Sequence, residues 1–308
     1  MKRVVVILIL LMSVLAGILY FGITSTQSFS KSVLVACTNE GALRVLLNER
    51  NSKQAWPGEK INDSTYLFNT IKYQIGSSLI NTTALDFFEY GKGELVIEET
   101  TPDSSRFTLV VSQQLPVQPL QRIKRFLALQ QTKKQVTDFL ILLQQRFDGE
   151  ELVYGISIKM NRVTDSAMIS TRTLMTHYPS VTEVYEQIEA IRKYIKENGG
   201  EETSAPMLNV FEEEKNQYLM MVAIPTKTYV KGNETFLQKR MLANGYILVS
   251  DITGGDYTIQ HAEHAMQQFV TDHHKSSPAI PFQMLLTDRR AEIDTSKWKT
   301  RVYYPVMY

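Results

Sequence analysis

The stretch Pro281–Val306, PFQMLLTDRRAEIDTSKWKTRVYYPV, decides the fold of the C-terminal half of this 308-residue chain. Its apolar run Met284–Leu286 is typical of a buried strand, and the polar residues Asp288–Ser296 favour a turn. Val302–Val306 is aromatic and β-branched and has a proline near its end, which is typical of a second strand. The stretch therefore predicts a β-hairpin with a polar loop.

The hairpin closes the second of two copies of an internal repeat. Each copy predicts a strand, a helix and two further strands. The spacing between Tyr178 and Tyr257 equals that between Pro225 and Pro305 to within one position. The predicted strands are Ala167–Thr173, Pro206–Glu212 and Tyr218–Ile224 in the first copy, and Tyr246–Asp251 and the two hairpin strands in the second. Two such units predict an α+β domain with pseudo-twofold symmetry.

The helix of the first copy has clear boundaries in the sequence. Ser180 and Glu183 form a capping-box pattern, and Gly199 and Gly200 predict the end of the helix. One face between these limits is apolar, with Val181, Val184, Tyr185, Ile188, Ile191 and Ile195. The pattern predicts an amphipathic helix.

The hairpin and the repeat resemble GyrI-like effector-binding domains, whose final hairpin closes one side of a small-molecule cleft. In that family the tail typically runs Pro-Phe-Glu-hydrophobic, Thr-Asp-Pro, Ser-Lys-Trp-x-Thr and Tyr-Tyr-Pro-Val. The matching residues here are Pro281, Phe282, Thr287, Asp288, Ser296, Lys297, Trp298, Thr300, Tyr303, Tyr304, Pro305 and Val306. The resemblance covers residues 156–308 and implies a cleft between the two halves. The chain departs from the family at Gln283, where an acidic residue is usual.

The repeat and the resemblance together suggest a set of ligand-binding residues. Rigid aromatic rings with a few polar tips suit amphipathic or cationic organic ligands. The candidates are Tyr178, Tyr257, Gln283, Trp298, Tyr303 and Tyr304. Because side chains alternate along a strand, Tyr303 and Tyr304 are expected on opposite faces of the sheet. At most one of these two lines the cleft, and packing in a core is the alternative role for each aromatic residue.

Gln283 decides between ligand classes. In family members that bind lipophilic cations or hydrolyse strained electrophiles, the glutamate at this position stabilises positive charge or acts as a base. Glutamine has no charge and no useful basicity, so both activities are weakened and neutral or zwitterionic ligands are favoured. Glu263, Glu212 and Glu213 are other sources of a carboxylate, but their helix and turn positions predict an exposed surface.

The N-terminal half predicts a second α+β domain. An early helix from Thr38, the tryptophan Trp56, a series of strands and a long helix follow one another. The strands are predicted at Lys31–Cys37, Thr65–Tyr73, Leu79–Phe88, Glu94–Glu99 and Phe107–Gln113, and the long helix from a capping box at Thr132 and Gln135. This order resembles the helix-grip layout of the SRPBCC (START-like) superfamily over Phe29–Phe147. The resemblance implies a hydrophobic ligand between sheet and helix, and an α+β domain without a ligand is the alternative.

The first residues predict a membrane anchor. Lys2 and Arg3 precede Val4–Ile23, which contains no charged residue. As a helix this run spans roughly 30 Å, the thickness of a bilayer core. Both cations favour a cytoplasmic N-terminus with the soluble domains outside the cytoplasm. A cleaved signal peptide and a buried soluble helix are the alternatives.

The expected organisation is a transmembrane segment and stalk at 1–28, a START-like domain at 29–150 and a GyrI-like domain at 156–308. The net charge is +1 and the sequence contains no concentrated run of basic residues, so nucleic acid is not an expected partner. The single cysteine, Cys37, excludes an intrachain disulfide. No Walker loop, dinucleotide fingerprint or nucleophile elbow occurs, so no cofactor is expected.

The histidines do not predict a metal site. His261 and His264 share a helical face, but no third ligand is evident in the sequence. His273 and His274 suit a helix C-terminus. The sequence thus predicts a membrane-anchored, extracytoplasmic and non-catalytic binder of a small hydrophobic or amphipathic molecule, for sequestration or sensing. A hydrolase that uses the same cleft and a protein-binding module are the alternatives.

Overall fold

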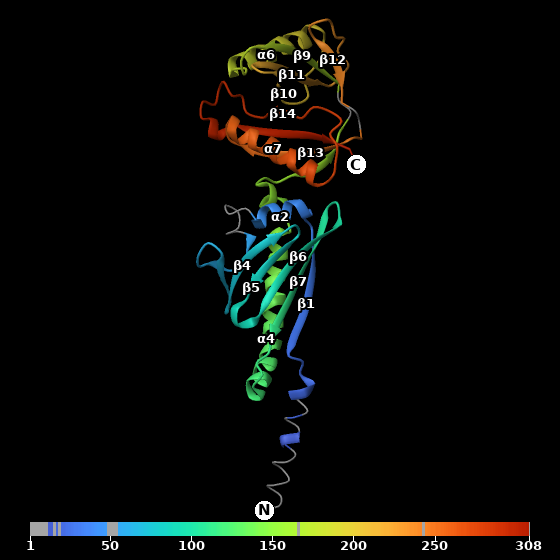
Figure 1. The fold of residues 1–308 in the computed structure, drawn as a ribbon. Coiled ribbons are helices and arrows are strands. Elements are labelled where there is room, and N and C mark those ends of the chain that lie inside the picture. Colours follow the sequence, from blue (N-terminus) through green and yellow to red (C-terminus); the bar gives the residue numbers. More distant parts are fainter. Residues whose placement is uncertain are drawn as a thin grey trace, which may run out of the picture. The chain divides into compact units, whose positions relative to one another are not determined.

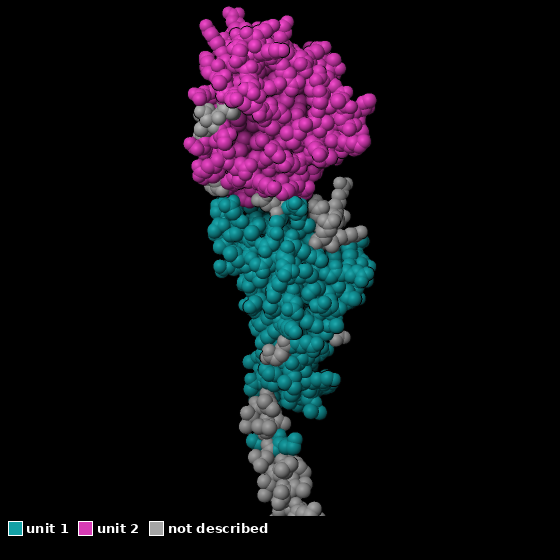
Figure 2. All heavy atoms as spheres, turned by 180° about the vertical axis from the view of Figure 1, so that it is seen from behind, with its two compact units in different colours: residues 1–153 teal, residues 154–308 magenta. Residues whose placement is uncertain are grey.

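The computed structural model describes residues 12–14, 17, 20–47, 55–164, 167–241 and 244–307. It divides into two compact units, Met1–Val153 and Tyr154–Tyr308 (Figure 2). Both units combine helices with one antiparallel sheet, so the α+β class is confirmed. Most of the predicted membrane span, Val4–Ile23, lies outside the described residues. Among those that are described, no helix is both long and apolar enough to cross a membrane.

Unit 1 is built on a seven-stranded sheet of order β1-β7-β6-β5-β4-β3-β2. The strands are β1 (Thr26–Val35), β2 (Glu59–Lys60), β3 (Thr65–Phe68), β4 (Ile71–Leu79), β5 (Thr82–Asp86), β6 (Lys92–Thr101) and β7 (Ser104–Gln114). Its helices are α2 (Asn39–Leu47), the short η1 (Phe88–Tyr90), α4 (Pro119–Phe147) and α5 (Glu150–Tyr154). Figure 1 shows the long helix α4 running along the sheet, and it packs against β1 and β7.

Aromatic rings fill the core of unit 1. The ring of Phe139 on α4 meets Phe68, Tyr73 and Phe87 edge-on, with centroid distances of 5.7, 5.2 and 6.2 Å. Tyr66 stacks on Tyr73 at 5.5 Å, and all of these rings are buried. Because the rings occupy the space between α4 and this part of the sheet, the interface here is packed rather than hollow.

Two strand predictions in unit 1 differ from the structure. The strand predicted at Lys31–Cys37 begins earlier, at Thr26, and as β1 it pairs with β7 from Thr26↔Gln114 to Val35↔Ser105. Much of this strand is exposed, so its sequence shows little apolar alternation. The single strand predicted at Thr65–Tyr73 is a hairpin of β3 and β4. Asn69 turns it with a φ of 54°, in the left-handed region that asparagine tolerates.

The long helix also begins earlier than predicted. α4 starts at Pro119, and proline suits the first helical position because its missing N–H would be unpaired there anyway. Thr132, the predicted cap, lies inside the helix, where its hydroxyl donates to the carbonyl of Ala128 at 3.3 Å. The side chain of Gln135 donates instead to Thr70, in the turn between β3 and β4, at 2.7 Å. The Thr-x-x-Gln spacing is therefore not a cap in this helix.

Unit 2 contains an eight-stranded sheet of order β12-β9-β11-β10-β14-β15-β13-β8. The strands are β8 (Lys159–Arg162), β9 (Ala167–Met175), β10 (Met207–Glu214), β11 (Gln217–Thr226), β12 (Leu237–Arg240), β13 (Tyr246–Thr253), β14 (Phe282–Leu285) and β15 (Lys299–Val306). The helices are α6 (Val181–Glu197), α7 (Asp256–Asp272) and the short η2 (Thr295–Lys297). The order β9-α6-β10-β11 recurs as β13-α7-β14-β15, as the repeat predicts. The outermost strands β8 and β12 are short and largely polar, and the sequence did not predict them.

The predicted capping box at the start of α6 is confirmed. The backbone N–H of Glu183 donates to Ser180 Oγ at 3.3 Å, and the N–H of Ser180 donates to Glu183 Oε2 at 2.8 Å. Gly199 follows the helix with a φ of 69°, which permits the left-handed turn that ends it. Ile188 and Ile191 are completely buried. The N-terminus of α6 is thereby fixed, and the candidate site begins there.

The two long helices of unit 2, α6 and α7, lie over the same face of its sheet. The two halves meet where Leu208 of β10 pairs with Gln283 of β14. Leu208 packs in the apolar cluster of α6, and Gln283 bonds to Glu263 of α7. Because paired residues share a face, the neighbouring pair Met207↔Met284 points to the other face. The sheet thus has one helix-covered face and one face without these helices.

Candidate functional site

A pocket of about 100 Å³ opens between the N-termini of α6 and α7, over the central strand β10. Tyr178 and Tyr185 form an aromatic wall, and Val210 contributes to the apolar part of the lining. Asp256 and Arg289 supply the charged groups. The pocket therefore combines rigid rings with a few polar groups, as small-molecule sites do, and its volume is below the range of about 300–1,000 Å³ that is typical of ligand pockets.

Arg289 is the central polar group of this pocket. Its side chain is only 8% exposed. Nη2 donates to Thr300 Oγ1 at 3.1 Å and to Gln283 Oε1 at 3.4 Å, and Nη1 lies 3.6 Å from Asp256 Oδ1. The guanidinium lies over the ring of Trp298 at 4.6 Å, a cation–π contact. Burial lowers the pKa of Arg289, but an arginine keeps its charge in proteins.

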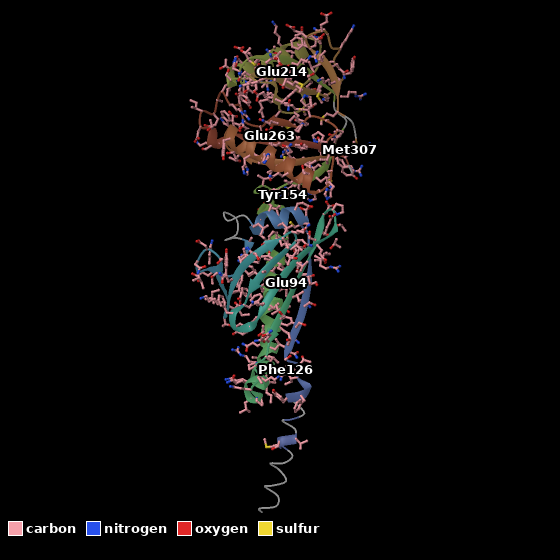
Figure 3. The ribbon with its side chains drawn as sticks, in the orientation of Figure 1. Glu94, Phe126, Tyr154, Glu214, Glu263 and Met307 are labelled. Atoms are coloured by element: carbon pink, nitrogen blue, oxygen red, sulfur yellow. The ribbon has the colours of Figure 1, made fainter. Side chains whose placement is uncertain are left out.

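Gln283 is buried and links Arg289 to a carboxylate. Its Nε2 donates to Glu263 Oε1 at 3.0 Å. Glu263 lies on α7 (Figure 3), and the expectation that it is exposed was wrong, because its side chain bonds to Gln283 of β14 and is half-buried. Burial raises the pKa of Glu263. Glu212 and Glu213 are exposed, as predicted.

The pH dependence of stability tests this burial. The raised pKa means that folded Glu263 binds its proton more tightly than the unfolded chain does. Its contribution to stability is therefore present at acid pH and is lost as pH rises above about 4.3 through the folded pKa. The variant Glu263→Gln removes this loss. Urea titrations are expected to show the stability of the variant improving relative to wild type between pH 4 and pH 7. A pH-independent difference would contradict the assignment.

Tyr178 and Tyr185 have different roles in the wall. Tyr178 is 43% exposed and meets Tyr218 edge-on at 5.8 Å. Burial raises its pKa, and nearby Asp256 adds to the shift. The hydroxyl of Tyr185 accepts the N–H of Arg289 at 2.8 Å and donates to the Thr287 carbonyl at 3.1 Å. Tyr185 thus fixes the hairpin loop that carries Arg289.

Of the six predicted site residues, Tyr178 lines the pocket, Gln283 contacts the lining residue Arg289, and the other four lie elsewhere. Tyr257 is 83% exposed at the start of α7. Trp298 is buried, and its ring lies against the guanidinium of Arg289. Its Nε1–H donates to the Glu292 carbonyl at 2.8 Å. Tyr303 stacks on Phe282 at 4.8 Å, on the face without helices. Tyr304 is half-buried on the helix-covered face, so the predicted alternation of the two tyrosines is confirmed.

Sequence reasoning missed Arg289, Asp256 and Tyr185. Tyr185 matched an apolar helical face and was assigned to the core. Arg289 does carry a signal, because it follows Thr287 and Asp288 where the resembled family has proline. The chain therefore departs from the family motif at two positions, Gln283 and Arg289, and the structure brings these two side chains into contact.

The histidines that the sequence assigns to the second helix of the repeat lie on α7 and at its C-terminal end. His261 and His264 are exposed on α7, and His273 Nδ1 lies 2.7 Å from the Phe269 carbonyl. Within the described ranges, no group of three or more His, Cys, Asp or Glu side chains is placed to hold a metal ion. Cys37 is buried and its thiol donates to the Thr38 carbonyl.

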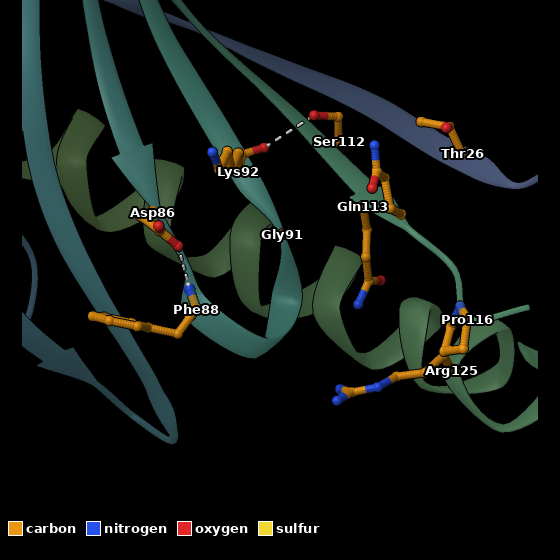
Figure 4. Close-up of a pocket in the computed structure, with 10 residues that line it drawn as sticks. Thr26, Asp86, Phe88, Gly91, Lys92, Ser112, Gln113, Pro116 and Arg125 are labelled. Atoms are coloured by element: carbon orange, nitrogen blue, oxygen red, sulfur yellow. Dashed lines mark hydrogen bonds between the residues drawn. The ribbon is translucent and has the colours of Figure 1, made fainter. Parts of the chain in front are cut away.

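Unit 1 has an open pocket of about 800 Å³ beside β1, β6, β7 and the first half of α4. Figure 4 shows Asp86, Lys92, Gln113 and Arg125 around it, so charges of both signs are present. The carboxylate of Asp86 already accepts the backbone N–H of Phe88 at 2.7 Å. Most of the lining side chains are polar or charged, unlike the hydrophobic cavity that the START-like resemblance implies.

Comparisons with known proteins found remote structural likenesses. Neither a family model nor a curated protein matches the sequence. The EcmrR C-terminal domain is 14% identical, with a TM-score of 0.42, and the match covers 49% of this chain and 98% of that one. A hydrolase from Listeria innocua is 13% identical over 49% of this chain and 91% of its own, with a TM-score of 0.39. SAV2435 bound to tetraphenylphosphonium is 10% identical over 49% and 94%, with a TM-score of 0.32. Likenesses at this level carry no conclusion about what this chain does.

Proposed function

We propose that unit 2 binds a small neutral or zwitterionic molecule, without catalysis, in the pocket between α6 and α7. The observation that carries this proposal is the nearly buried guanidinium of Arg289 at the pocket. A guanidinium has five N–H donors. Among the described side chains, Gln283 and Thr300 accept hydrogen bonds from Arg289, and Asp256 lies near it as an ion-pair partner. Its carboxylate partner Asp256 is half-exposed and 3.6 Å away. Arg289 therefore retains donors for an acidic or carbonyl group of a ligand.

The charges of the pocket favour this class of ligand over a cation. A buried guanidinium repels a cationic ligand, whereas it attracts a carboxylate or a carbonyl oxygen. Asp256 lines the same pocket and suits a cationic or donor group at the other end of a zwitterion. The aromatic wall of Tyr178 and Tyr185 suits an apolar portion. Sequestration or sensing of such a molecule follows from binding without turnover.

The membrane anchor remains a proposal that rests on the sequence. Val4–Ile23 supports anchoring of the chain with both units outside the cytoplasm. Fractionation of host cells is expected to recover the full chain with membranes, and external protease is expected to degrade unit 2 in intact cells. Recovery in the soluble cytoplasmic fraction would contradict this part of the proposal.

Glu263 supports a second candidate function, a hydrolase of reactive small molecules. The carboxylate that Gln283 lacks is present 3.0 Å away, supplied by α7. Its raised pKa suits a general base or acid that works closer to neutral pH. Turnover of an epoxide probe that disappears in Glu263→Gln would establish this alternative. The absence of turnover in wild type would leave binding as the function.

Native mass spectrometry of the full chain, purified from its own host, tests the binding proposal. Wild type is expected to retain a small molecule. Val210→Trp fills the pocket and is expected to lose the molecule. Leu174→Trp places the same ring at a 55%-exposed position of β9 that does not line the pocket, and is expected to keep it. An unliganded wild type, or a ligand retained by Val210→Trp, would refute the proposal. A co-purifying protein instead would point to a protein-binding module.

A further inference from the structure

The face of the unit 2 sheet without helices carries a separate pocket of about 580 Å³. Its floor includes Met168, Met207, Met221 and Ala223, from β9, β10 and β11. Met207 precedes Leu208, which packs against α6, so the floor lies on the opposite side of the sheet from Arg289. The volume falls within the range of about 300–1,000 Å³ that is typical of ligand pockets.

The walls of this pocket are also apolar. The segment Pro278–Phe282, which leads into β14, forms one wall, and Met241 lies beyond the end of β12. Met307, labelled in Figure 3 near the C-terminus, is another lining residue. Methionine side chains are flexible and polarisable, so a methionine-rich floor adapts to aliphatic chains of different shape. The lining thus suits an unbranched apolar chain better than a rigid polar molecule.

The charges at the pocket have one sign. Among the described residues that line the pocket, the charged ones are Lys239 and Arg240, at the end of β12. None of these lining residues has a carboxylate side chain. Lys239 pairs with Met168 in the sheet, so both side chains point to the same face. Lys239 is exposed and has no ion pair with any residue that the structure describes. Its ammonium group is available to an anion at the end of the methionine floor.

We infer that this second pocket binds an amphipathic molecule with an aliphatic chain and an anionic end group, as in a fatty acid. The chain lies along the methionine floor, and the anionic group lies at Lys239. Each methylene that enters the pocket contributes about 0.8 kcal/mol, which is about fourfold in affinity. This second pocket is distinct from the pocket at Arg289. The variant Arg289→Met is therefore expected to leave the affinity of the second pocket for the amphipathic anion unchanged.

Methionine-methyl NMR of the full chain in lipid nanodiscs tests this inference, with dodecanoate as the probe and empty nanodiscs as the background. Dodecanoate is expected to shift the methyl signals of Met168, Met207 and Met221. Met220 faces the α6 core and its signal is expected to stay in place, which also reports that each variant is folded. Decanoate is expected to bind about 16-fold more weakly, from about fourfold for each of two methylenes.

Two charge variants test whether the pocket recognises the anionic end group or only binds apolar chains non-specifically. Lys239→Glu is expected to weaken dodecanoate binding about three- to tenfold, because the attraction of an exposed cation becomes repulsion. Lys193→Glu makes the same change on α6, where the side chain is 77% exposed, and is expected to have no effect. Ala223→Trp fills the floor and is expected to abolish the shifts. The inference is overturned if the floor methyls do not respond, if Lys239→Glu binds as wild type does, or if dodecyltrimethylammonium binds as well as dodecanoate.

Discussion

The double variant Gln283→Glu with Arg289→Met is expected to bind a lipophilic cation such as benzyltrimethylammonium at least tenfold more tightly than wild type. The new carboxylate would lie beside Glu263, whose Oε1 is 3.0 Å from the present amide. Two carboxyl groups this close share a proton, so the pair carries about one negative charge at neutral pH. With Arg289 gone, that charge faces the aromatic wall without a fixed cation. A charge-assisted contact of about 1.5–3 kcal/mol corresponds to roughly 10–150-fold in affinity.

The single variant Gln283→Glu is the informative control. Arg289 Nη2 lies 3.4 Å from Gln283 Oε1, so a carboxylate there would pair with the guanidinium. The single variant is therefore expected to gain no cation affinity. Fluorescence titration of the three proteins measures this directly. Cation binding by the single variant, or none by the double variant, would show that Arg289 does not set the charge preference of the pocket.

Replacement of Phe139 by alanine is expected to lower the free energy of unfolding of unit 1 by about 3–5 kcal/mol. The ring is 2% exposed and meets the rings of Phe68, Tyr73 and Phe87 at 5.2 to 6.2 Å. Its removal leaves a cavity that these rigid rings cannot close, and it loses three edge-on contacts. Leu127→Ala on the same helix is the matched control, because that side chain is 66% exposed. Its effect is expected to be below about 0.5 kcal/mol.

The two tryptophans allow this loss to be assigned to one unit. Trp56 is buried in unit 1, and Trp298 is buried in unit 2. In a Trp298→Phe background, fluorescence during urea titration reports unit 1 alone. The transition of Phe139→Ala is expected at much lower urea than that of Leu127→Ala. Coincident transitions for the two variants would mean that the aromatic cluster does not hold this unit together.

Local patterns predicted much of unit 2. The capping box of Ser180 and Glu183 acts within three residues, so the sequence alone shows it. The opposite faces of Tyr303 and Tyr304 follow from the period of a strand. The repeat predicts the order of strands and helices because each half must bury its own apolar face. These features depend on neighbouring residues, and they were predicted correctly.

Long-range contacts account for what the sequence did not predict. Arg289 lies in a polar loop that local rules assign to a solvated turn. Its burial depends on Tyr185, Thr300 and Trp298, which a prediction of separate elements does not bring together. Glu263 lies on a helix flank, and only the position of β14 decides that it is half-buried. The start of α4 was missed because a local pattern was trusted. The Thr132 spacing matches a helix cap, but it occurs inside the helix.

The two departures from the resembled family motif have one physical explanation. A glutamate at position 283 would form an ion pair with Arg289, so a change at one position alters the role of the other. Glutamine at 283 keeps the hydrogen bonds to both Arg289 and Glu263 without adding a charge. The pocket is thereby left with a cation at its floor. Its ligand preference follows from that pair rather than from Gln283 alone.

Calorimetric titration of the molecule that co-purifies with the chain is the most direct test of Arg289 as the ligand-binding cation. Full-length wild type, Arg289→Met and Arg301→Met would be compared. Arg301 is the matched control, because it pairs with Asp251 and does not line the pocket. Arg289→Met is expected to raise the dissociation constant more than tenfold, from the loss of a charged hydrogen bond of about 1.5–3 kcal/mol, while Arg301→Met leaves it unchanged. Equal dissociation constants for wild type and Arg289→Met would contradict the account.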